Sequence, residues 1–173
     1  MTEKNSLLLI TILLTFLSWS LASFGAERSS AQHSKNTSFV LTDTTGKQHA
    51  LTHYKGKWVI VNYWATWCPP CLEEVPDLVA LYDSRKNKDV MLLGVVFDYQ
   101  DAKEVADYVD DMLMSYPIVL GDDEVTKQIG SAEVMPTTFI YNPHGELVKI
   151  KRGLVTKPFL EDLMAKGNKK SIR

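Results

Sequence analysis

The stretch that decides the fold is GKWVIVNYWATWCPPC, residues 56–71, in which an apolar segment runs straight into two closely spaced cysteines. Residues 57–64 are rich in Val, Ile and aromatic side chains, a pattern typical of a central strand buried on both faces. Over 70–86, apolar residues recur every three or four positions, which predicts an amphipathic helix. Cys68 and Cys71 therefore lie where a buried strand gives way to a helix, a place where open α/β sheets carry their chemistry.

The rest of the chain alternates between strand and helix patterns in the same way. Strands are predicted at 38–42, 47–52, 90–97 and 117–121, a hairpin over 137–153, and helices at 101–113, 122–130 and 156–166. The first two strands flank the turn residues DTTG and form an N-terminal hairpin. This order of elements predicts an α/β fold, a three-layer sandwich on a mixed sheet.

The N-terminal segment is predicted to lie outside this domain. Residues 7–17 are uninterruptedly apolar apart from threonines, so we interpret residues 1–26 as a signal peptide or an uncleaved membrane anchor. A polar linker over 27–37, the domain over 38–168 and a basic tail at 169–173 follow. Both interpretations predict export, to the periplasm or the outer face of the cytoplasmic membrane. Net charge is −2 without a basic stripe, which excludes a nucleic-acid footprint.

The spacing of the cysteines favours redox chemistry over a structural role. A four-residue ring gains about 2 kcal/mol from cross-link entropy, against about 3 kcal/mol for a fifteen-residue loop. Covalent haem attachment would require His after the second cysteine, where this chain has Leu72. The four histidines, His33, His49, His53 and His144, show no ligand spacing around the pair. We therefore predict a redox dithiol with a Cys68–Cys71 disulfide, without metal or cofactor.

The two cysteines are predicted to have different roles. Cys68 lies at the helix N-terminus, where the helix dipole favours a thiolate, so we expect an accessible attacking nucleophile with a lowered pKa. Cys71, almost one turn later, resolves the mixed disulfide. Pro69 and Pro70 suit the first helical turn, and both lack an N–H that would otherwise face the sulfur. We interpret the two prolines as biasing the dithiol toward acting as a reductant. The alternative is that they only make the turn rigid.

Two motifs together carry a family resemblance. Two stretches resemble sequences of the thioredoxin superfamily: FVLTDTTGKQHALTHYKGKWVIVNYWATWCPPCLEEVP and VMPTTFIYNPHGEL. Within it, the chain is similar to exported thiol–disulfide oxidoreductases of the TlpA/ResA/CcmG type over residues 38 to about 165. The resemblance implies a thioredoxin-like sandwich with an N-terminal β-hairpin and a helical insert, and the predicted helix at 101–113 fits that insert.

The resemblance also implies roles for residues outside the dithiol. Trp67 matches the tryptophan that borders the dithiol. Pro136 matches the proline that faces the cysteines after a cis peptide bond, so the Met135–Pro136 bond is expected to be cis. The Met135 backbone is then expected to hydrogen-bond a bound polypeptide, with Thr137 following in the substrate-binding loop.

Glu74 is the candidate proton carrier. It lies three residues after Cys71 on the same helix face and matches an acidic residue that is near the second cysteine in this subgroup. Its alternative role is to complement the helix N-terminus together with Glu73. Asn62, where cytosolic thioredoxins carry an aspartate, cannot titrate, so a carboxylate that deprotonates Cys71 must come from elsewhere. We expect Glu74→Gln to slow exchange and to leave stability nearly unchanged.

The predicted function is an exported thiol–disulfide oxidoreductase, mainly a disulfide reductase for polypeptide clients, recharged by a membrane thiol-electron donor. The cytochrome c maturation branch suggests an apocytochrome client by analogy. One alternative is a peroxiredoxin, but Ala65 and Val61 stand where its Thr or Ser and its Pro would be. The other is a copper chaperone, whose cysteines are three residues apart and are joined by a distant histidine, for which His144 in a turn is a poor candidate.

Overall fold

The computed structural model describes residues 38–171, and the side chains of 38–168. The predicted signal or anchor (1–26) and linker (27–37) lie outside these residues, as does the end of the predicted tail (172–173). The last helix, α5 (Lys157–Ser171), continues through the first residues of that predicted tail. Within the described range, no helix combines the length and apolar character needed to span a bilayer.

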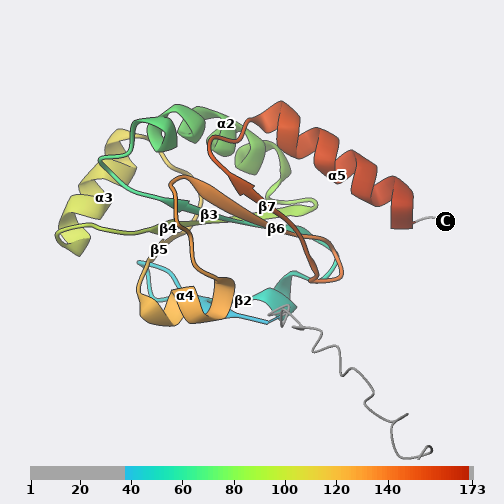
Figure 1. Cartoon of the computed structure of the whole chain (residues 1–173), viewed down its shortest axis with the longest axis horizontal. Helices are drawn as coiled ribbons and strands as arrows, with labels where there is room; N and C mark the ends of the chain where they lie inside the picture. Colours follow the sequence, from blue (N-terminus) through green and yellow to red (C-terminus); the bar gives the residue numbers. More distant parts are fainter. Residues whose placement is uncertain (1–37, 172–173) are drawn as a thin grey trace, which may run out of the picture. The chain divides into compact units, whose positions relative to one another are not determined.

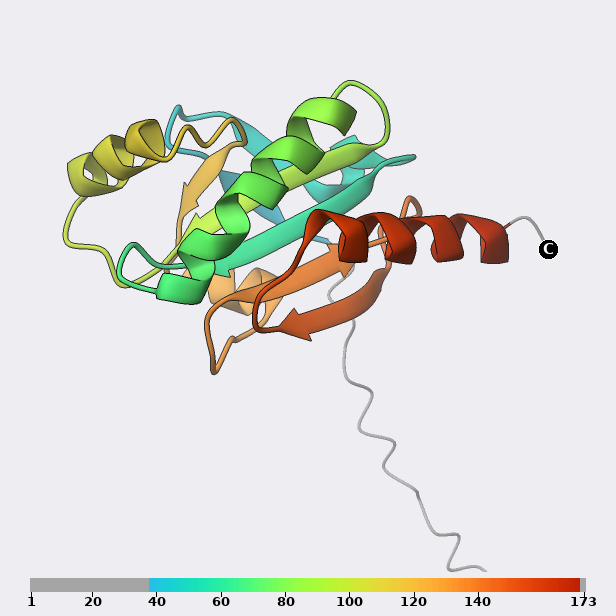
Figure 2. The same cartoon turned by 90° about the horizontal axis from the view of Figure 1, so that it is seen from above.

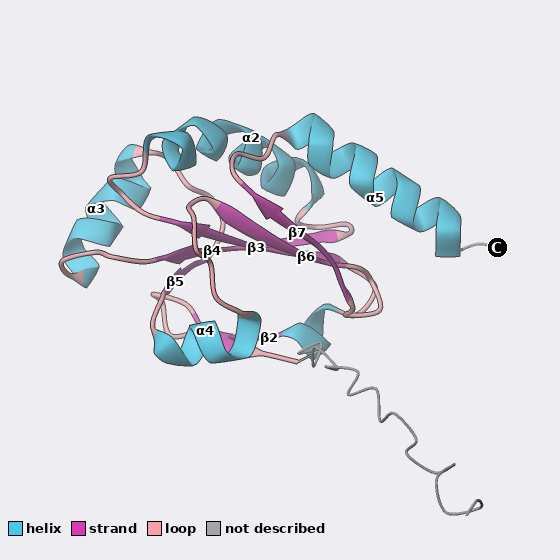
Figure 3. Ribbon diagram, viewed as in Figure 1, coloured by secondary structure: helices cyan, strands magenta, loops and turns pink. Residues whose placement is uncertain are grey.

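A five-stranded mixed sheet forms the centre of the domain, as predicted (Figures 1 and 3). Its order is β5-β4-β3-β6-β7. The strands are β3 (Trp58–Trp64), β4 (Val90–Val96), β5 (Ile118–Leu120), β6 (Thr137–Tyr141) and β7 (Leu147–Arg152). Strands β3, β4 and β5 are parallel, whereas β6 runs antiparallel to β3 and pairs with β7 as a hairpin. The central position of β3 explains why it is apolar apart from Asn62, because other elements cover both of its faces.

Helices cover one face of the sheet, and the N-terminal hairpin with a short helix covers the other. Figure 2 shows α2 (Pro69–Arg85) lying diagonally across the strands, with α5 beside it and α3 (Ala102–Asp111) near the β5 edge. On the opposite face lie β1 (Val40–Thr42), β2 (Gln48–Ala50), the 3-10 turn η1 (Leu51–Tyr54) and α4 (Asp123–Ile129). The three-layer sandwich, the N-terminal hairpin and the helix after β4 are therefore confirmed.

Each face of the sheet has its own apolar cluster. Alternate residues of β3 divide between the two: Ile60 joins the cluster under α2, α3 and α5, whereas Val59 and Val61 join the cluster under the hairpin and α4. Both cysteines belong to the first cluster. The dithiol is thus placed at the edge of a packed core rather than on a free loop.

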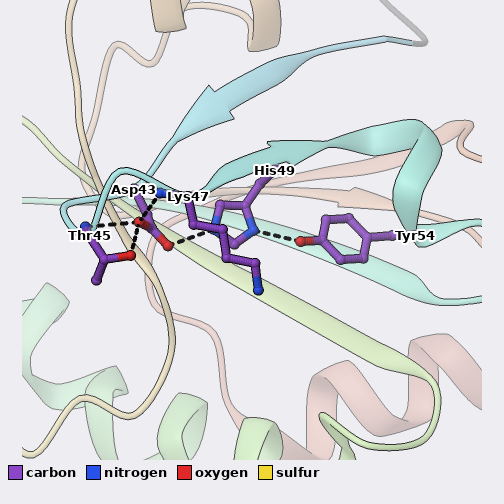
Figure 4. A network of polar contacts seen from close by, with 5 residues as sticks. All are labelled: Asp43, Thr45, Lys47, His49 and Tyr54. Carbon is purple, nitrogen blue, oxygen red and sulfur yellow. Dashed lines mark hydrogen bonds and ion pairs between the residues drawn. The ribbon is translucent and has the colours of Figure 1, made fainter.

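A buried polar network fixes the N-terminal hairpin against the second face (Figure 4). His49, fully buried, lies 2.7 Å through Nε2 from Asp43 Oδ2 and 2.6 Å through Nδ1 from the Tyr54 hydroxyl. Because an ionised carboxylate can only accept, the N–H at Nε2 donates to Asp43, while Nδ1 forms a hydrogen bond with the Tyr54 hydroxyl. The other Asp43 oxygen accepts from the backbone N–H groups of Thr45 and Lys47. Since every buried polar atom of this network has a partner, the hairpin is locked to a single register.

Candidate active site

The two cysteines form a disulfide at the junction of β3 and α2. Their Cα atoms are 5.3 Å apart, within the usual range for a disulfide. Cys68 is the N-cap of α2 and has an extended backbone, while Cys71 lies within the first turn. The structure bonds the two cysteines that the sequence pairs, and helix α2 begins at Pro69, one residue earlier than the pattern predicts.

The burial of Cys68 differs from the sequence-based expectation of an accessible sulfur. In this oxidised form the residue is 3% exposed, and Cys71 is 1% exposed. Met135, which is partly buried, packs against the apolar cluster that contains both cysteines. The Met135 loop, which is distant in sequence, therefore packs against the same apolar cluster as the disulfide.

The prolines leave the helix N-terminus with few donors for the Cys68 sulfur. Pro69 and Pro70 occupy the first two helical positions, where neither residue has a backbone N–H. The next N–H, that of Cys71, donates to the backbone oxygen of Cys68 at 3.0 Å. Stabilisation of a thiolate at Cys68 therefore depends on the helix dipole more than on direct hydrogen bonds.

Glu74 is a buried carboxyl held by strand β3 and by the segment between β7 and α5. It is 1% exposed and follows Cys71 by one turn on the buried face of α2. Its Oε1 accepts from Asn62 Nδ2 of β3 at 2.7 Å, and its Oε2 accepts from the backbone N–H of Val155 at 2.8 Å. These partners hold the Glu74 carboxyl inside the fold, whereas the neighbouring Glu73 is exposed.

Burial gives this carboxyl an unusual acidity. Desolvation raises the pKa of Glu74 from 4.5 to about 7, against the lowering effect of hydrogen bonds from Val155 and Asn62 and of the Lys151 charge. A carboxyl with such a pKa exchanges a proton near neutral pH, which is what general acid–base chemistry requires. Glu74 follows Cys71 by one turn on the buried face of the same helix.

The loop before β6 has the expected cis peptide bond between Met135 and Pro136. Thr137 was expected to help bind substrate, yet its side chain is buried and donates to the Val134 backbone oxygen at 2.6 Å, so it shapes the loop from within. Within the described residues, no hydrogen bond occupies the backbone N–H or C=O of Met135. That backbone is thus available for an extended polypeptide, and the exposed Val134 adds apolar surface beside it.

Trp67 is 60% exposed immediately before the nucleophile, so it presents a broad apolar surface next to the disulfide. Its neighbour Thr66 donates through Oγ1 to Glu104 Oε1 of α3 at 3.1 Å. The second carboxylate oxygen of Glu104 accepts from the backbone N–H of Gln100. Sequence reasoning did not anticipate this link between the insert helix and the active-site loop, because both residues read as ordinary surface positions.

Comparisons with known proteins agree with this geometry. A family model described as the AhpC/TSA family matches residues 33–150. The thiol–disulfide oxidoreductase ResA of Bacillus subtilis (strain 168) is 33% identical over 144 residues, covering 83% of this chain and 79% of that protein.

The chain belongs to the thioredoxin-like AhpC/TSA family.

Within this family it groups with the ResA-named thiol–disulfide oxidoreductases, so the predicted enzyme class is confirmed. Solved structures support the same fold. StoA from Bacillus subtilis has a TM-score of 0.63 and 30% identity, covering 72% of this chain and 94% of that chain. A thiol:disulfide interchange protein of the thioredoxin family from Chlorobium tepidum TLS has a TM-score of 0.68 and 26% identity, covering 75% and 92%.

Proposed function

We propose that this protein is an exported disulfide reductase that acts on polypeptide clients through its Cys68–Cys71 dithiol. The observation that carries the proposal is a disulfide at a helix N-terminus with a buried carboxyl, Glu74, one turn behind it. The apolar stretch at 7–17 supports export. The exposed Trp67 and the free backbone of Met135 supply a surface on which an extended segment would lie.

The reaction follows from the order of the two sulfurs. The Cys68 thiolate attacks a client disulfide, so that a Cys68–client bond forms and the client thiolate leaves. Cys71 then gives its proton to the Glu74 carboxylate and attacks the Cys68 sulfur. This step forms the Cys68–Cys71 disulfide and releases the second client thiolate, which takes up a proton. One client thiolate takes a proton from solvent and the other takes up the equivalent of the proton that Glu74 releases, so the client gains two electrons and two protons and the protein ends in its oxidised form.

The direction of electron flow follows from the scarcity of donors at Cys68. Strong oxidants of this fold stabilise their reduced form, chiefly through the thiolate, and their potentials lie near −120 mV, against about −270 mV for thioredoxin. With Pro69 and Pro70 lacking N–H groups and the Cys71 N–H bonded to a carbonyl, the thiolate gains less. We therefore infer a reductant, recharged in the exported compartment by a membrane thiol-electron donor. An apocytochrome client stays a prediction by analogy.

Neither alternative function is favoured. Ala65 and Val61, both fully buried, occupy the positions where a peroxiredoxin would carry a hydroxyl residue and a proline. His144 lies in the turn between β6 and β7, at the opposite end of β3 from Cys68. Among residues 38–171, no three His, Cys, Asp or Glu side chains gather in a way that would hold a metal ion.

Two measurements test the proposal. The reduced protein is expected to cleave the disulfides of insulin and, at equilibrium with glutathione, to show a potential near that of thioredoxin. A potential near that of the strong oxidants would reverse the inferred direction. Failure to react with insulin, when thioredoxin reacts under the same conditions, would remove the reductase function itself.

A further inference from the structure

The side chain that contacts Glu74 from β3 has a second buried partner. Asn62 donates through Nδ2 to Glu74 Oε1 at 2.7 Å and, with its other proton, to Thr138 Oγ1 of β6 at 3.1 Å. All three residues are buried, and Asn62 and Thr138 are register partners across β3 and β6. Both protons of one amide are therefore committed when Glu74 is ionised.

Protonation of Glu74 creates a conflict in this arrangement. A proton on Oε1 faces the Asn62 N–H, and a proton on Oε2 faces the backbone N–H of Val155. Two donors facing each other in a buried site leave both without an acceptor, which is strongly unfavourable. The Val155 N–H belongs to the backbone and cannot become an acceptor. An amide side chain presents an oxygen instead of a nitrogen when it rotates by half a turn.

We propose that Asn62 and Thr138 form a reorienting hydrogen-bond pair that follows the protonation of Glu74. With Glu74 ionised, the Asn62 amide donates to the carboxylate and to the Thr138 hydroxyl. With Glu74 protonated on Oε1, the amide turns over, and its oxygen accepts from the carboxyl O–H and from the Thr138 O–H. A hydroxyl serves as donor or acceptor, so Glu74 Oε1 and the Thr138 hydroxyl each keep a partner in both states, while the Asn62 Nδ2 protons turn away from them in the protonated state.

The other ionisable groups around Glu74 do not supply the missing acceptor. Lys151 of β7 contributes a positive charge, and its Nζ donates to the Arg152 backbone oxygen. An ammonium has donors only. Tyr116, just before β5, interacts electrostatically with Glu74, and its burial raises its own pKa, so it stays protonated near neutral pH. Cys71, on the helix of Glu74, is bonded to Cys68 in the oxidised form.

This inference rests on the proposed function, in which Glu74 takes the Cys71 proton and later releases it. A carboxyl that carries protons in a dry site needs good partners in both states, and Asn62 supplies them where an apolar residue would not. An aspartate at position 62 would add a second titrating group beside Glu74. Asn62 and Thr138 are accordingly positioning residues, because they act on the chemistry through Glu74.

The test is an NMR titration of the full-length, isotope-labelled, oxidised protein, in which no thiol titrates. As the pH falls, both Asn62 Nδ2 protons are expected to move upfield, with the same midpoint as the Glu74 carboxyl carbon. Absence of any change at Asn62, or movement of only the proton that faces Glu74, would overturn the proposal. Insulin reduction by the wild-type protein reports on the proposed function separately, because the titration requires no turnover.

Matched variants sharpen the result. In Glu74→Gln the Asn62 protons are expected to be independent of pH and to lie at their acid-form positions, because the new amide donates as the carboxylic acid does. Thr138→Ser keeps the hydroxyl and should preserve the titration of both protons. Thr138→Val removes it and should flatten the titration of the Thr138-facing proton alone. If the Thr138-facing proton of Asn62 still shifts with pH in Thr138→Val, the assigned pairing of Asn62 with Thr138 is wrong.

Discussion

Replacement of Glu74 by Gln is expected to change the pH dependence of stability as well as the rate of exchange. The pKa of this carboxyl is raised from 4.5 to about 7 by burial. An acid with a raised folded-state pKa binds more protons folded than unfolded between these two values, so its contribution is fully present below pH 4.5 and is lost as pH rises through 7. Each pH unit corresponds to about 1.4 kcal/mol, so the loss amounts to about 3 kcal/mol.

The assay compares unfolding free energies of oxidised wild-type and Glu74→Gln protein by urea denaturation at pH 4.5, 6, 7 and 8. Other titrating groups are common to both proteins and cancel in the difference. That difference is expected to shift by about 3 kcal/mol in favour of the variant between pH 4.5 and 8. Glu73→Gln is the matched control, since Glu73 is exposed on the same helix, and its difference from wild type should stay nearly constant.

The rate of exchange provides the second readout. Loss of a positioned proton carrier lowers a rate by about 100-fold at the low end of the usual range, so Glu74→Gln should resolve mixed disulfides about 100-fold more slowly. The wild-type rate should also show an ionisation near pH 7 that the variant lacks. If the unfolding free energies of Glu74→Gln and wild type change in parallel with pH, the burial of Glu74 does not raise its pKa as argued. An unchanged exchange rate would remove the proton-carrier role.

Three further outcomes are expected. Cys71→Ala should retain its polypeptide client as a stable adduct through Cys68, seen as a reducible higher-mass band; a variant that never forms adducts would contradict the order of attack. Met135→Ala should speed reduction of the disulfide by dithiothreitol, because it removes a side chain that packs against the cluster containing the buried pair. Val134→Ala, at the exposed neighbour, should not change this rate, and equal rates in the two variants would show that Met135 does not shield the disulfide. Burial tends to raise the pKa of Asp43, but its hydrogen bonds outweigh this and lower the pKa to about 2, so its contribution is present above pH 3.8 and lost as pH falls through 2. Asp43→Asn should therefore be less stable than wild type at pH 5 and approach it near pH 2, and a difference independent of pH would refute the ionic contribution.

The sequence was sufficient to predict the central sheet and the dithiol, because both depend on local patterns. The apolar run of β3 and the helical periodicity after it place Cys68 and Cys71 without knowledge of distant contacts. Glu74 was proposed from its spacing along the helix together with the family resemblance. The effect of Glu74 on stability could not be predicted, since the sequence around a helical Glu gives no sign that the side chain is buried. The sequence suggested that Glu74→Gln would leave stability nearly unchanged, whereas the structure predicts an effect that depends strongly on pH.

Contacts between distant segments account for what the sequence did not predict. Asn62 marked only the absence of a titrating group, whereas in the fold it donates directly to Glu74. Cys68 and Met135 come from distant segments to one apolar cluster, and His49 is buried where the hairpin brings it to Asp43. Each of these contacts joins residues whose local patterns are ordinary, so only the tertiary arrangement reveals them.

The raised pKa of Glu74 underlies both its cost to stability and its usefulness as a proton carrier. A carboxyl that kept its ordinary pKa would be almost wholly ionised at neutral pH and would release a proton too readily to hold it between the two steps of exchange. Raising the pKa to about 7 corrects this, and by linkage it also lowers the stability of the folded protein at alkaline pH. A substitution that restores the stability by removing the buried charge must therefore remove the proton carrier. Stabilising changes that preserve activity must instead come from regions that do not contact Glu74, such as the hairpin on the opposite face of the sheet.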